Sequence, residues 1–276
     1  MARTKTINYP FWNPRYENVH VEVEKRLIRS DWKCLVQRFA NTLKSRFKGR
    51  DRLIVLDIGC GDGTTAATLL PLIEIPVVYH GIEPDAKTIR VCKRNLNPVD
   101  CVIGSQFSTC TFGDFGEFKD SYDLVLFFHS NYYIAENLCK YKAMLQMSLE
   151  GLRSEGVVAI ITLPDFSPFY RLGPGNVFPD FATAETTHRL LLQLDLCVTS
   201  YQNRVRFLFD EHEIPEKESH RFAQYLANDP TLSESESRII RDRLGSAARL
   251  SRGEIDFCDW TLIAQLDRHF ESHDSV

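Results

Sequence analysis

The sequence predicts an α/β protein in which helices cover both faces of a mostly parallel sheet. Two observations predict this fold class. Short apolar runs, as expected of buried strands, alternate with segments of helical periodicity, and the connections between them are short. The first of these runs also ends in a glycine-rich turn that leads directly into a predicted helix. An apolar share of 43% and a charged share of 25% agree with a globular protein.

The predicted elements follow in chain order. Apolar side chains recur at helical spacing over residues 15–47, which predicts a helical N-terminal segment. Continuous or alternating apolar runs then predict strands at 53–58, 77–82, 122–129, 157–163, 197–209 and 260–266. Helical spacing predicts helices at 64–73, 86–95, 134–152 and 183–194, and two short helices within 215–250. Thr183 is a suitable N-cap for the helix that it begins.

The same pattern divides the chain into three predicted parts. Residues 1–50 form an N-terminal arm and helical lid, in which an aromatic, proline-containing stretch precedes the helix. An arm that only packs on the core explains this stretch equally well. Residues 51–165 form a ligand-binding core. Residues 166–276 complete the sheet and add a substrate-side loop and a small helical insertion at about 210–252.

Charge and cysteine usage restrict the functional class. The net charge of −4 gives no general attraction to nucleic acid or to an anionic membrane. No apolar run reaches the roughly 20 residues of a membrane helix, and the N-terminus lacks the apolar segment of a secretory signal. The eight cysteines include no CxxC pair, which favours reduced thiols over a metal site. We therefore expect a cytoplasmic monomer or homodimer without a bound metal, a nucleic-acid partner or a membrane partner.

The glycine-rich turn after the first predicted strand is the most informative motif. Asp57 lies two residues before the run Gly-Cys-Gly-Asp-Gly at 59–63. Glycines let a ligand approach the backbone, and the amides at the start of the next helix attract acceptor groups. The run lacks the G-x-G-x-x-G pattern of dinucleotide enzymes, and a carboxylate here would repel a pyrophosphate but suits a cationic amino-acid ligand. We predict that Asp57, Gly59, Cys60 and Gly61 contact such a ligand.

Two further acids follow later predicted elements. Glu83, which precedes Pro84, lies roughly 20 residues beyond the turn, where an acid can accept both hydroxyls of a ribose. Asp114 can accept the exocyclic amine of adenine, and its neighbours Phe112 and Phe115 can stack on the base. Each acid taken alone can equally be a solvated loop carboxylate. Together with the glycine turn, they predict a nucleoside site.

These motifs resemble the nucleotide-binding half of the class I S-adenosylmethionine-dependent methyltransferases, over about residues 50–165. The resemblance implies a Rossmann-like, doubly wound sheet of seven strands. It also implies S-adenosylmethionine as the cofactor and methyl transfer as the activity. Pro84 is a further predicted cofactor contact, and Phe128 would line the adenosine site by its position in the narrower family resemblance that follows. The motifs specify the cofactor but not the methyl acceptor.

A narrower resemblance, to the histamine N-methyltransferase-like branch, spans most of the chain. It rests on Tyr132-Tyr133 after the predicted strand 122–129, on the late helical insertion, and on the glycine-led approach to the last strand. His129 and Asp259 stand where that branch has a substrate-binding Gln and a substrate-binding Asn. The resemblance implies in-line methyl transfer to a small, nitrogen-containing aromatic molecule. Glu17 is the best match for the N-terminal acidic anchor of that branch.

The chemistry of methyl transfer gives these residues roles. A sulfonium methyl group is already activated, so the protein mainly aligns the acceptor and excludes water. Tyr132 and Tyr133 can form aromatic walls that face a cation, and Asp259 can hold an amine or a ring N–H. His129 is placed to contact the substrate and to take a proton as the catalytic base. A structural role, in packing or at a strand entry, explains each of them as well.

Other functions stay open at this stage. An O- or C-methyltransferase of a small metabolite or natural product fits the cofactor motifs equally well, and so does methylation of a protein. A catalytically silent S-adenosylmethionine-binding or interaction module is disfavoured, because the glycine turn and Glu83 are intact. A nicotinamide-dependent oxidoreductase is disfavoured by Asp57 and by the missing G-x-G-x-x-G pattern.

Overall fold

The computed structural model describes residues 29–116, 118–135, 137–167, 182–208, 220, 223, 233–250 and 254–266. The strands are β1 (Leu53–Ile58), β2 (Val77–Ile82), β3 (Val102–Ser108), β4 (Tyr122–Phe128), β5 (Leu152–Thr162), β6 (Leu196–Leu208) and β7 (Glu254–Leu266). The α-helices in this part of the chain are α2 (Arg29–Arg46), α3 (Thr64–Ile73), α4 (Ala86–Leu96), α5 (Leu138–Glu150), α6 (Ala184–Leu192) and α8 (Glu234–Leu250).

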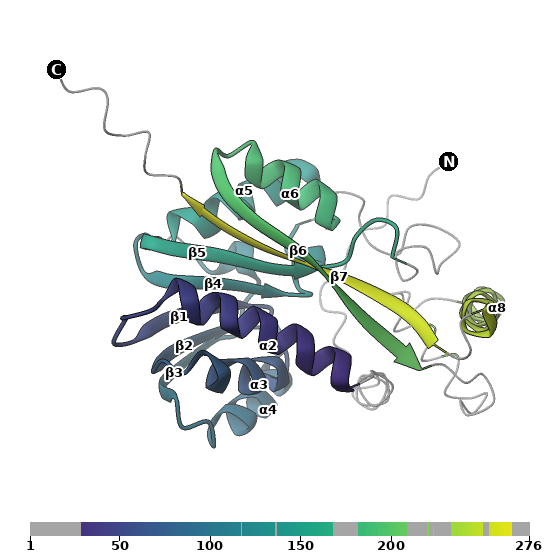
Figure 1. Ribbon diagram of the computed structural model, residues 1–276, viewed down its shortest axis with the longest axis horizontal. Coiled ribbons are helices and arrows are strands. Elements are labelled where there is room, and N and C mark those ends of the chain that lie inside the picture. Colours follow the sequence, from purple (N-terminus) through teal and green to yellow (C-terminus); the bar gives the residue numbers. More distant parts are fainter. Residues whose placement is uncertain are drawn as a thin grey trace. The chain divides into compact units, whose positions relative to one another are not determined.

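The strands form one seven-stranded sheet in the order β3-β2-β1-β4-β5-β7-β6 (Figure 1). β1 pairs in parallel with β2 and β4, and the parallel pairing continues to β3 on one side and to β5 on the other. β7 runs antiparallel to β5. The predicted doubly wound, mostly parallel sheet is therefore confirmed. The strand order reverses between β1 and β4, and ligands of such sheets bind at the carboxyl ends of the strands beside this point.

Helices cover both faces of the sheet. Successive side chains of a strand point to opposite faces. On β7, Trp260 contacts the His188 ring of α6, with ring centroids 6.4 Å apart. Ile263, which has the opposite parity, shares a cavity lining with α2. The central strands between these layers are buried on both sides. In β4, for example, every residue except the last is buried. This explains why continuous apolar runs marked the central strands correctly.

Side-chain caps define where the helices begin. The Asp85 carboxylate accepts a hydrogen bond from the Thr88 amide at 2.9 Å and starts α4 directly after β2. The predicted cap Thr183 is confirmed, because its hydroxyl accepts a hydrogen bond from the Thr186 amide at 3.1 Å. Such caps replace the missing intrahelical partners of the first turn. α4 therefore begins within three residues of Glu83, which keeps that acid next to the sheet edge.

The strands β3 and β7 differ from the prediction. β3 is absent from the predicted strands because it is an edge strand with mostly exposed or half-buried side chains and a glycine at 104. Of the two short helices predicted within 215–250, the second corresponds to α8, and the first falls largely outside the described residues. β7 begins at Glu254, earlier than the predicted strand at 260–266. Hydrogen bonds between the strand backbones set these strand boundaries, and the pattern of side chains in the sequence does not record them.

The chain divides into two compact units. The larger comprises residues 34–164, 181–203 and 259–276 and contains the central strands. The smaller comprises residues 1–33, 165–180 and 204–258. In the smaller unit Arg206 pairs with Asp31 through Nε and Oδ2 at 2.7 Å, and His220 bonds the Ser237 hydroxyl at 2.6 Å. The three-part division expected from the sequence stays a prediction. In the described part, no helix is both long and apolar enough to cross a bilayer.

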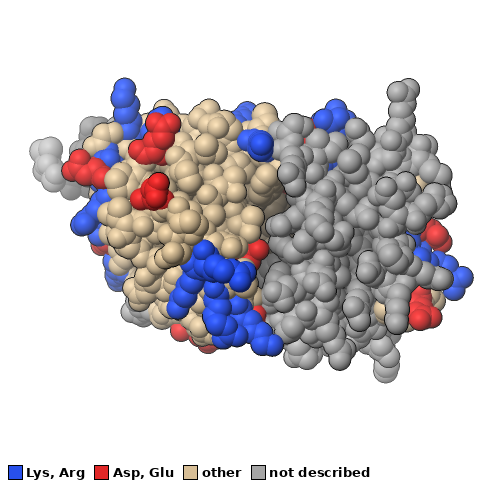
Figure 2. All heavy atoms as spheres, turned by 90° about the horizontal axis from the view of Figure 1, so that it is seen from below, with Lys and Arg blue, Asp and Glu red and all other residues tan. Residues whose placement is uncertain are grey.

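Charged side chains of both signs lie on the described surface. α4 exposes Lys87, Arg90, Lys93 and Arg94. Figure 2 shows one face of the molecule, on which several Lys and Arg side chains form a cluster and other charged side chains of both signs are scattered around it. Lys93 is also directed over the ring of Phe107 on β3, with its nitrogen 5.3 Å from the ring centroid.

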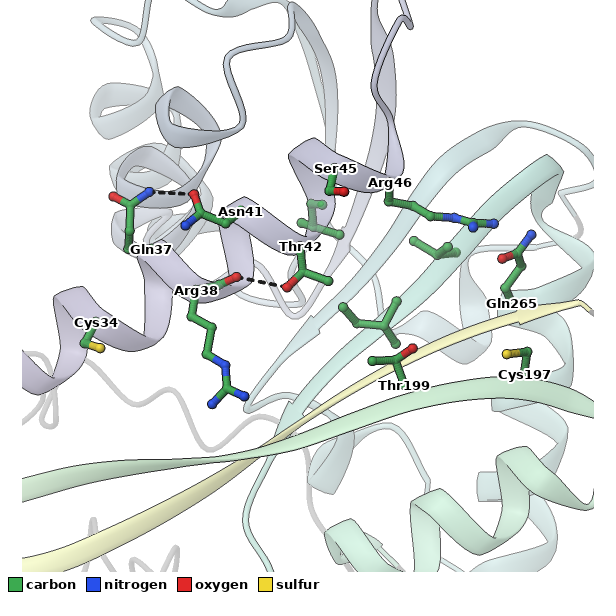
Figure 3. A pocket seen from close by; sticks show the side chains of 13 residues that line it. Cys34, Gln37, Arg38, Asn41, Thr42, Ser45, Arg46, Cys197, Thr199 and Gln265 are labelled. Atoms are coloured by element: carbon green, nitrogen blue, oxygen red, sulfur yellow. Dashed lines mark hydrogen bonds between the residues drawn. The ribbon is translucent and has the colours of Figure 1, made fainter.

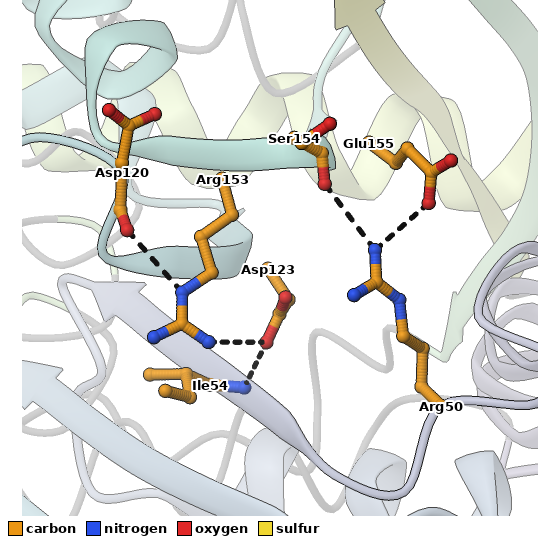
Figure 4. A network of polar contacts seen from close by, with 7 residues as sticks. All are labelled: Arg50, Ile54, Asp120, Asp123, Arg153, Ser154 and Glu155. Carbon is orange, nitrogen blue, oxygen red and sulfur yellow. Dashed lines mark hydrogen bonds and ion pairs between the residues drawn. The ribbon is translucent and has the colours of Figure 1, made fainter.

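A polar network ties together the amino-terminal ends of β1, β4 and β5 (Figure 4). The buried carboxylate of Asp123 accepts a hydrogen bond from the Ile54 amide at 2.8 Å, and Arg153 lies 3.9 Å from the same oxygen. Arg50 donates to the Ser154 carbonyl at 3.4 Å and to the Glu155 carboxylate at 3.0 Å. This network fixes the sheet edge opposite the predicted site.

Replacing Asp123 with alanine is expected to lower the free energy of unfolding by about 1–3 kcal/mol, because the Ile54 amide loses its acceptor. Denaturant titration of the variant measures this loss. The affinity for S-adenosylhomocysteine should stay within twofold of the wild-type value at temperatures where the variant is folded. A large loss of affinity in folded protein would contradict a purely structural role of the network.

Candidate active site

The glycine turn combines three left-handed residues that have different roles. Gly59, Gly61 and Gly63 have φ values of 71°, 55° and 77°. A Cβ added to Gly59 would lie 2.5 Å from the Cβ of Ser130, and one added to Gly63 would lie 2.6 Å from the Sγ of Cys92. A Cβ on Gly61 would meet no atom within 4 Å. Packing therefore requires glycine at 59 and 63, and Gly61 is the one of the three that faces open space.

The turn is attached to the end of β2. The amides of Gly59 and Cys60 both donate to the Ile82 carbonyl, at 2.9 Å and 3.0 Å. The amide of Gly61 donates to Glu83 Oε2 at 3.3 Å, and Glu83 Oε1 accepts a hydrogen bond from the Asp85 amide at 3.1 Å. Two of the predicted motifs are thus joined directly, because Glu83 holds the turn that follows β1.

Two buried acids lie under this turn. Asp57 is 4% exposed and accepts a hydrogen bond from the phenol of Tyr79 at 2.7 Å. Burial raises the pKa of Asp57 to about 6, although the hydrogen bond from Tyr79 lowers it. Burial also raises the pKa of Glu83 to about 7; the amides of Asp85 and Gly61 oppose this shift, and the charges of Asp85 and Asp57 add to it. A cationic ligand would therefore stabilise the charged forms of these two carboxyl groups.

The predicted adenine residues lie on and after a short 3₁₀ helix, Phe112–Asp114. Asp114 is exposed, and its carboxylate accepts a hydrogen bond from the Thr111 hydroxyl at 2.6 Å. Phe115 is half-buried and meets the ring of His80 edge-on, with centroids 5.0 Å apart. Phe112 is buried instead against Phe127. The expectation that both phenylalanines can stack on a base is therefore wrong for Phe112, because its side chain packs in the core.

His129 follows β4 in a left-handed conformation with φ of 53°, which is uncommon for a residue other than glycine. Its amide donates to the Ile161 carbonyl at 2.9 Å, so pairing with β5 holds this geometry. The ring stacks on Tyr132, with centroids 6.4 Å apart and planes at 19°, and meets Phe128 edge-on at 5.3 Å. Strained backbone of this kind clusters at functional sites.

Asp259 of β7 lies beside His129. Nε2 of the histidine lies 3.4 Å from Oδ2 of Asp259, and Nδ1 lies 3.4 Å from the hydroxyl of Tyr132. The side chain of Asp259 is 1% exposed, whereas that of His129 is 27% exposed. Within the described residues, Oδ1 of Asp259 has no hydrogen-bond partner. A buried carboxylate oxygen without a donor is costly, so this atom is suited to accept a ligand N–H.

The loop after β4 is fixed by buried polar contacts. Tyr132, in the 3₁₀ helix Asn131–Tyr133, is 3% exposed and its hydroxyl accepts a hydrogen bond from the Leu163 amide. Asn131 is fully buried and donates to the Ala182 carbonyl at 2.9 Å. The sequence reasoning missed Asn131; an amide between an apolar strand and two tyrosines was its only signal. The side chain of Tyr133 and all of Glu17 lie outside the described residues.

A separate cavity of about 980 Å³ lies between α2 and the strands β5, β6 and β7 (Figure 3). Polar side chains such as Gln37, Asn41 and Gln265 line much of it. The guanidinium of Arg38 sits 4.0 Å from the ring centroid of Tyr201 and donates to the carbonyl of residue 202 at 3.2 Å. None of the predicted site residues lines this cavity.

Comparisons with known proteins agree with the fold. Residues 55–156 match a family model described as a methyltransferase domain. The YcgJ protein of Bacillus subtilis is 16% identical, with a TM-score of 0.55 over 82% of this chain and 96% of that chain. The plantazolicin methyltransferase BpumL, in complex with SAH, is 17% identical, with a TM-score of 0.55 over 93% and 92% of the two chains. No curated protein sequence matches the chain.

The fold by itself leaves the reaction open. The [4+2]-cyclase SpnF is 14% identical, with a TM-score of 0.52 over 83% of this chain and 81% of that chain. The matched methyltransferase domain contains the glycine turn, Glu83 and β4, which are the features that predicted the cofactor. We conclude that the chain contains a methyltransferase domain, which includes residues 55–156, and that S-adenosylmethionine is its cosubstrate.

Proposed function

We propose that the protein transfers the methyl group of S-adenosylmethionine to a small, nitrogen-containing aromatic molecule beside His129 and Asp259. The buried carboxylate of Asp259 carries this proposal. One of its oxygens faces His129 and the other has no hydrogen-bond partner among the described residues. Trp260 pairs with Thr162 at the end of β5, so Asp259 lies at the carboxyl edge of the sheet, as the glycine turn does.

The cofactor would bind along the ends of β1, β2 and β4. Glu83 is suited to the ribose hydroxyls, and Asp57 to the cationic amino-acid part, because both are buried acids, one bonded to the Gly61 amide and the other just before the glycine turn. Half-exposed Phe115, with Asp114, is suited to the adenine, and Phe128 to the adenosine wall. When bound, the cofactor supplies an activated sulfonium methyl group.

A proton acceptor would complete the transfer. The N–H of the acceptor would donate to Oδ1 of Asp259, which aligns the nitrogen. As the N–C bond forms and the C–S bond breaks with its electron pair left on sulfur, the displaced proton would pass to Nδ1 of His129. Nδ1 carries a lone pair in the tautomer whose Nε2–H donates to Asp259, and the acceptor would replace the 3.4 Å contact of this atom with the Tyr132 hydroxyl. Asp259 would then stabilise the imidazolium, and the stacked ring of Tyr132 would keep it aligned.

The negative charge of Asp259 indicates which kinds of acceptor the site can bind. The resemblance to the histamine N-methyltransferase-like branch supports nitrogen as the methylated atom. A carboxylate at Asp259, where that branch has an amide, favours an acceptor with a positive charge or an N–H. A buried carboxylate would repel a carboxylic acid or a phenolate. Tyr132 lies against His129 and contributes to this aromatic environment, while Tyr133 and Glu17 remain predicted contacts.

A substrate screen tests the proposal. Amines, nitrogen heterocycles, phenols and phenolic acids would be incubated with the protein and a methyl-labelled cofactor. We expect transfer to amines or heterocycles, and weaker transfer by the Asp259→Asn variant. Robust activity on phenolic acids, with none on nitrogen compounds, would overturn the acceptor class without affecting the methyltransferase assignment.

The raised pKa values of Glu83 and Asp57 predict that cofactor binding depends on pH. The free protein must lose a proton from Glu83, with a pKa of about 7, before this carboxylate binds a ligand in its charged form. Affinity for S-adenosylhomocysteine should therefore fall roughly tenfold from pH 8 to pH 6, with a smaller further loss from Asp57. Because folding raises the pKa values of Glu83 and Asp57, these two acids lower the stability of the free protein as the pH rises towards 7. Calorimetry at several pH values measures the affinity, and a flat profile would contradict the assigned acids.

A further inference from the structure

We propose that Tyr79 is a positioning residue that holds the Asp57 carboxylate in place under the glycine turn and keeps it charged for the cofactor. This inference rests on the proposed cofactor role of Asp57. Tyr79 lies on β2, two residues before Gly81, which is in register with Asp57 of β1. Its hydroxyl donates to Asp57 Oδ2 at 2.7 Å. The phenol thus fixes the direction of one carboxylate oxygen.

The phenol has little freedom to leave this position. The side chain of Tyr79 is fully buried, and its ring lies 5.9 Å from that of Phe107 on β3. A Cβ added to Gly81 would lie 3.1 Å from Cε1 of this ring, so glycine provides the space that the ring occupies. The ring is therefore clamped between neighbouring strands. A clamped donor fixes the direction of its acceptor without further loss of side-chain entropy on ligand binding.

The groups around Asp57 make this hydrogen bond important. Glu83, at the end of β2, adds a like charge, and the Cys60 thiol of the turn lies near both carboxylates. On the other side, β4 places the apolar Leu126 in register with Asp57. Within the described residues, no lysine, arginine or histidine contributes to the pKa of Asp57. The Tyr79 phenol is therefore the group that offsets the burial of this carboxylate.

Tyr79 remains a donor over the whole working range of pH. Burial raises the pKa of its phenol well above the usual value, and the charge of Asp57 raises it further. The phenol therefore keeps its proton while Asp57 loses its own. A phenylalanine at this position would keep the ring but remove the donor, so burial alone would then act on Asp57 and a neutral carboxyl would prevail at neutral pH. A neutral carboxyl would not attract the cationic part of the cofactor.

The Tyr79→Phe variant separates positioning from packing. Calorimetric titration with S-adenosylhomocysteine, between about pH 5.5 and pH 9, would compare the wild type with Tyr79→Phe, Asp57→Asn and the double variant. At pH 7 we expect Tyr79→Phe to bind at least about fivefold more weakly. At pH 9 most of the loss should disappear, because Asp57 ionises even without its donor. In the Asp57→Asn background, adding Tyr79→Phe should change the affinity by less than twofold.

Tyr141→Phe is the matched control, because it removes another buried phenol, which bonds the Thr187 hydroxyl at 2.8 Å on α6. Its pH profile should follow that of the wild type. If Asp57→Asn binds as tightly as the wild type, the proposed cofactor role of Asp57 fails. If Asp57→Asn binds weakly but Tyr79→Phe keeps the wild-type profile, or loses the same factor at every pH, only the role of Tyr79 is overturned.

Discussion

Replacing Gly61 with leucine is expected to weaken the binding of S-adenosylhomocysteine at least tenfold, about 1.4 kcal/mol. A side chain at this position enters open space on the turn, where the cofactor would approach the backbone. The protein should still fold, because no atom lies within 4 Å of the new Cβ. The left-handed φ of 55° should cost about 1–2 kcal/mol of stability. Calorimetry and thermal unfolding measure the two effects separately.

Gly49→Leu is the matched control. Gly49 is also left-handed, with φ of 86°, and its Cβ would also meet nothing within 4 Å, but it follows α2 rather than β1. This variant should lose comparable stability and keep its affinity for the cofactor product. Gly59→Ala should behave in the opposite way and mainly lose stability, because of its contact with Ser130. Unchanged affinity in folded Gly61→Leu protein would reject the position of the cofactor.

Replacing His129 with alanine is expected to lower kcat about 100-fold, if the histidine takes the acceptor proton. Cofactor affinity should change little, since His129 itself is not one of the proposed cofactor contacts. Asp259→Asn should raise the KM of the acceptor more than it lowers kcat, because the amide keeps the shape but loses the charge. Steady-state kinetics with the best acceptor of the screen would measure both effects.

His188→Ala provides the control for these kinetics. His188 lies on α6 and contacts Trp260, the neighbour of Asp259 on the opposite face of β7. Its removal should leave kcat and KM nearly unchanged. Wild-type kcat in His129→Ala would show that the histidine only packs against Tyr132. A rise in KM alone in that variant would make His129 a substrate contact without a role in proton transfer.

The sequence alone determined the central strands, the glycine turn and the cofactor. These features are local, because a strand buried on both faces must be apolar over its whole length, and a left-handed turn requires glycine. Glu83 could be placed from its distance along the chain, since it directly follows the strand that pairs with β1. Thr183 could be assigned as a cap because a helix start depends on the neighbouring residues only.

Only the tertiary structure decided which of the predicted site residues lie together. Tyr79 is one more apolar-looking residue of a buried strand until β2 pairs with β1 and brings its phenol to Asp57. His129 and Asp259 were predicted as separate substrate contacts, and antiparallel pairing of β5 with β7 makes them one pair. β3 escaped prediction because backbone hydrogen bonds hold an edge strand whatever its side chains are. Contacts between residues distant in the chain depend on strand order and register, which no local pattern records.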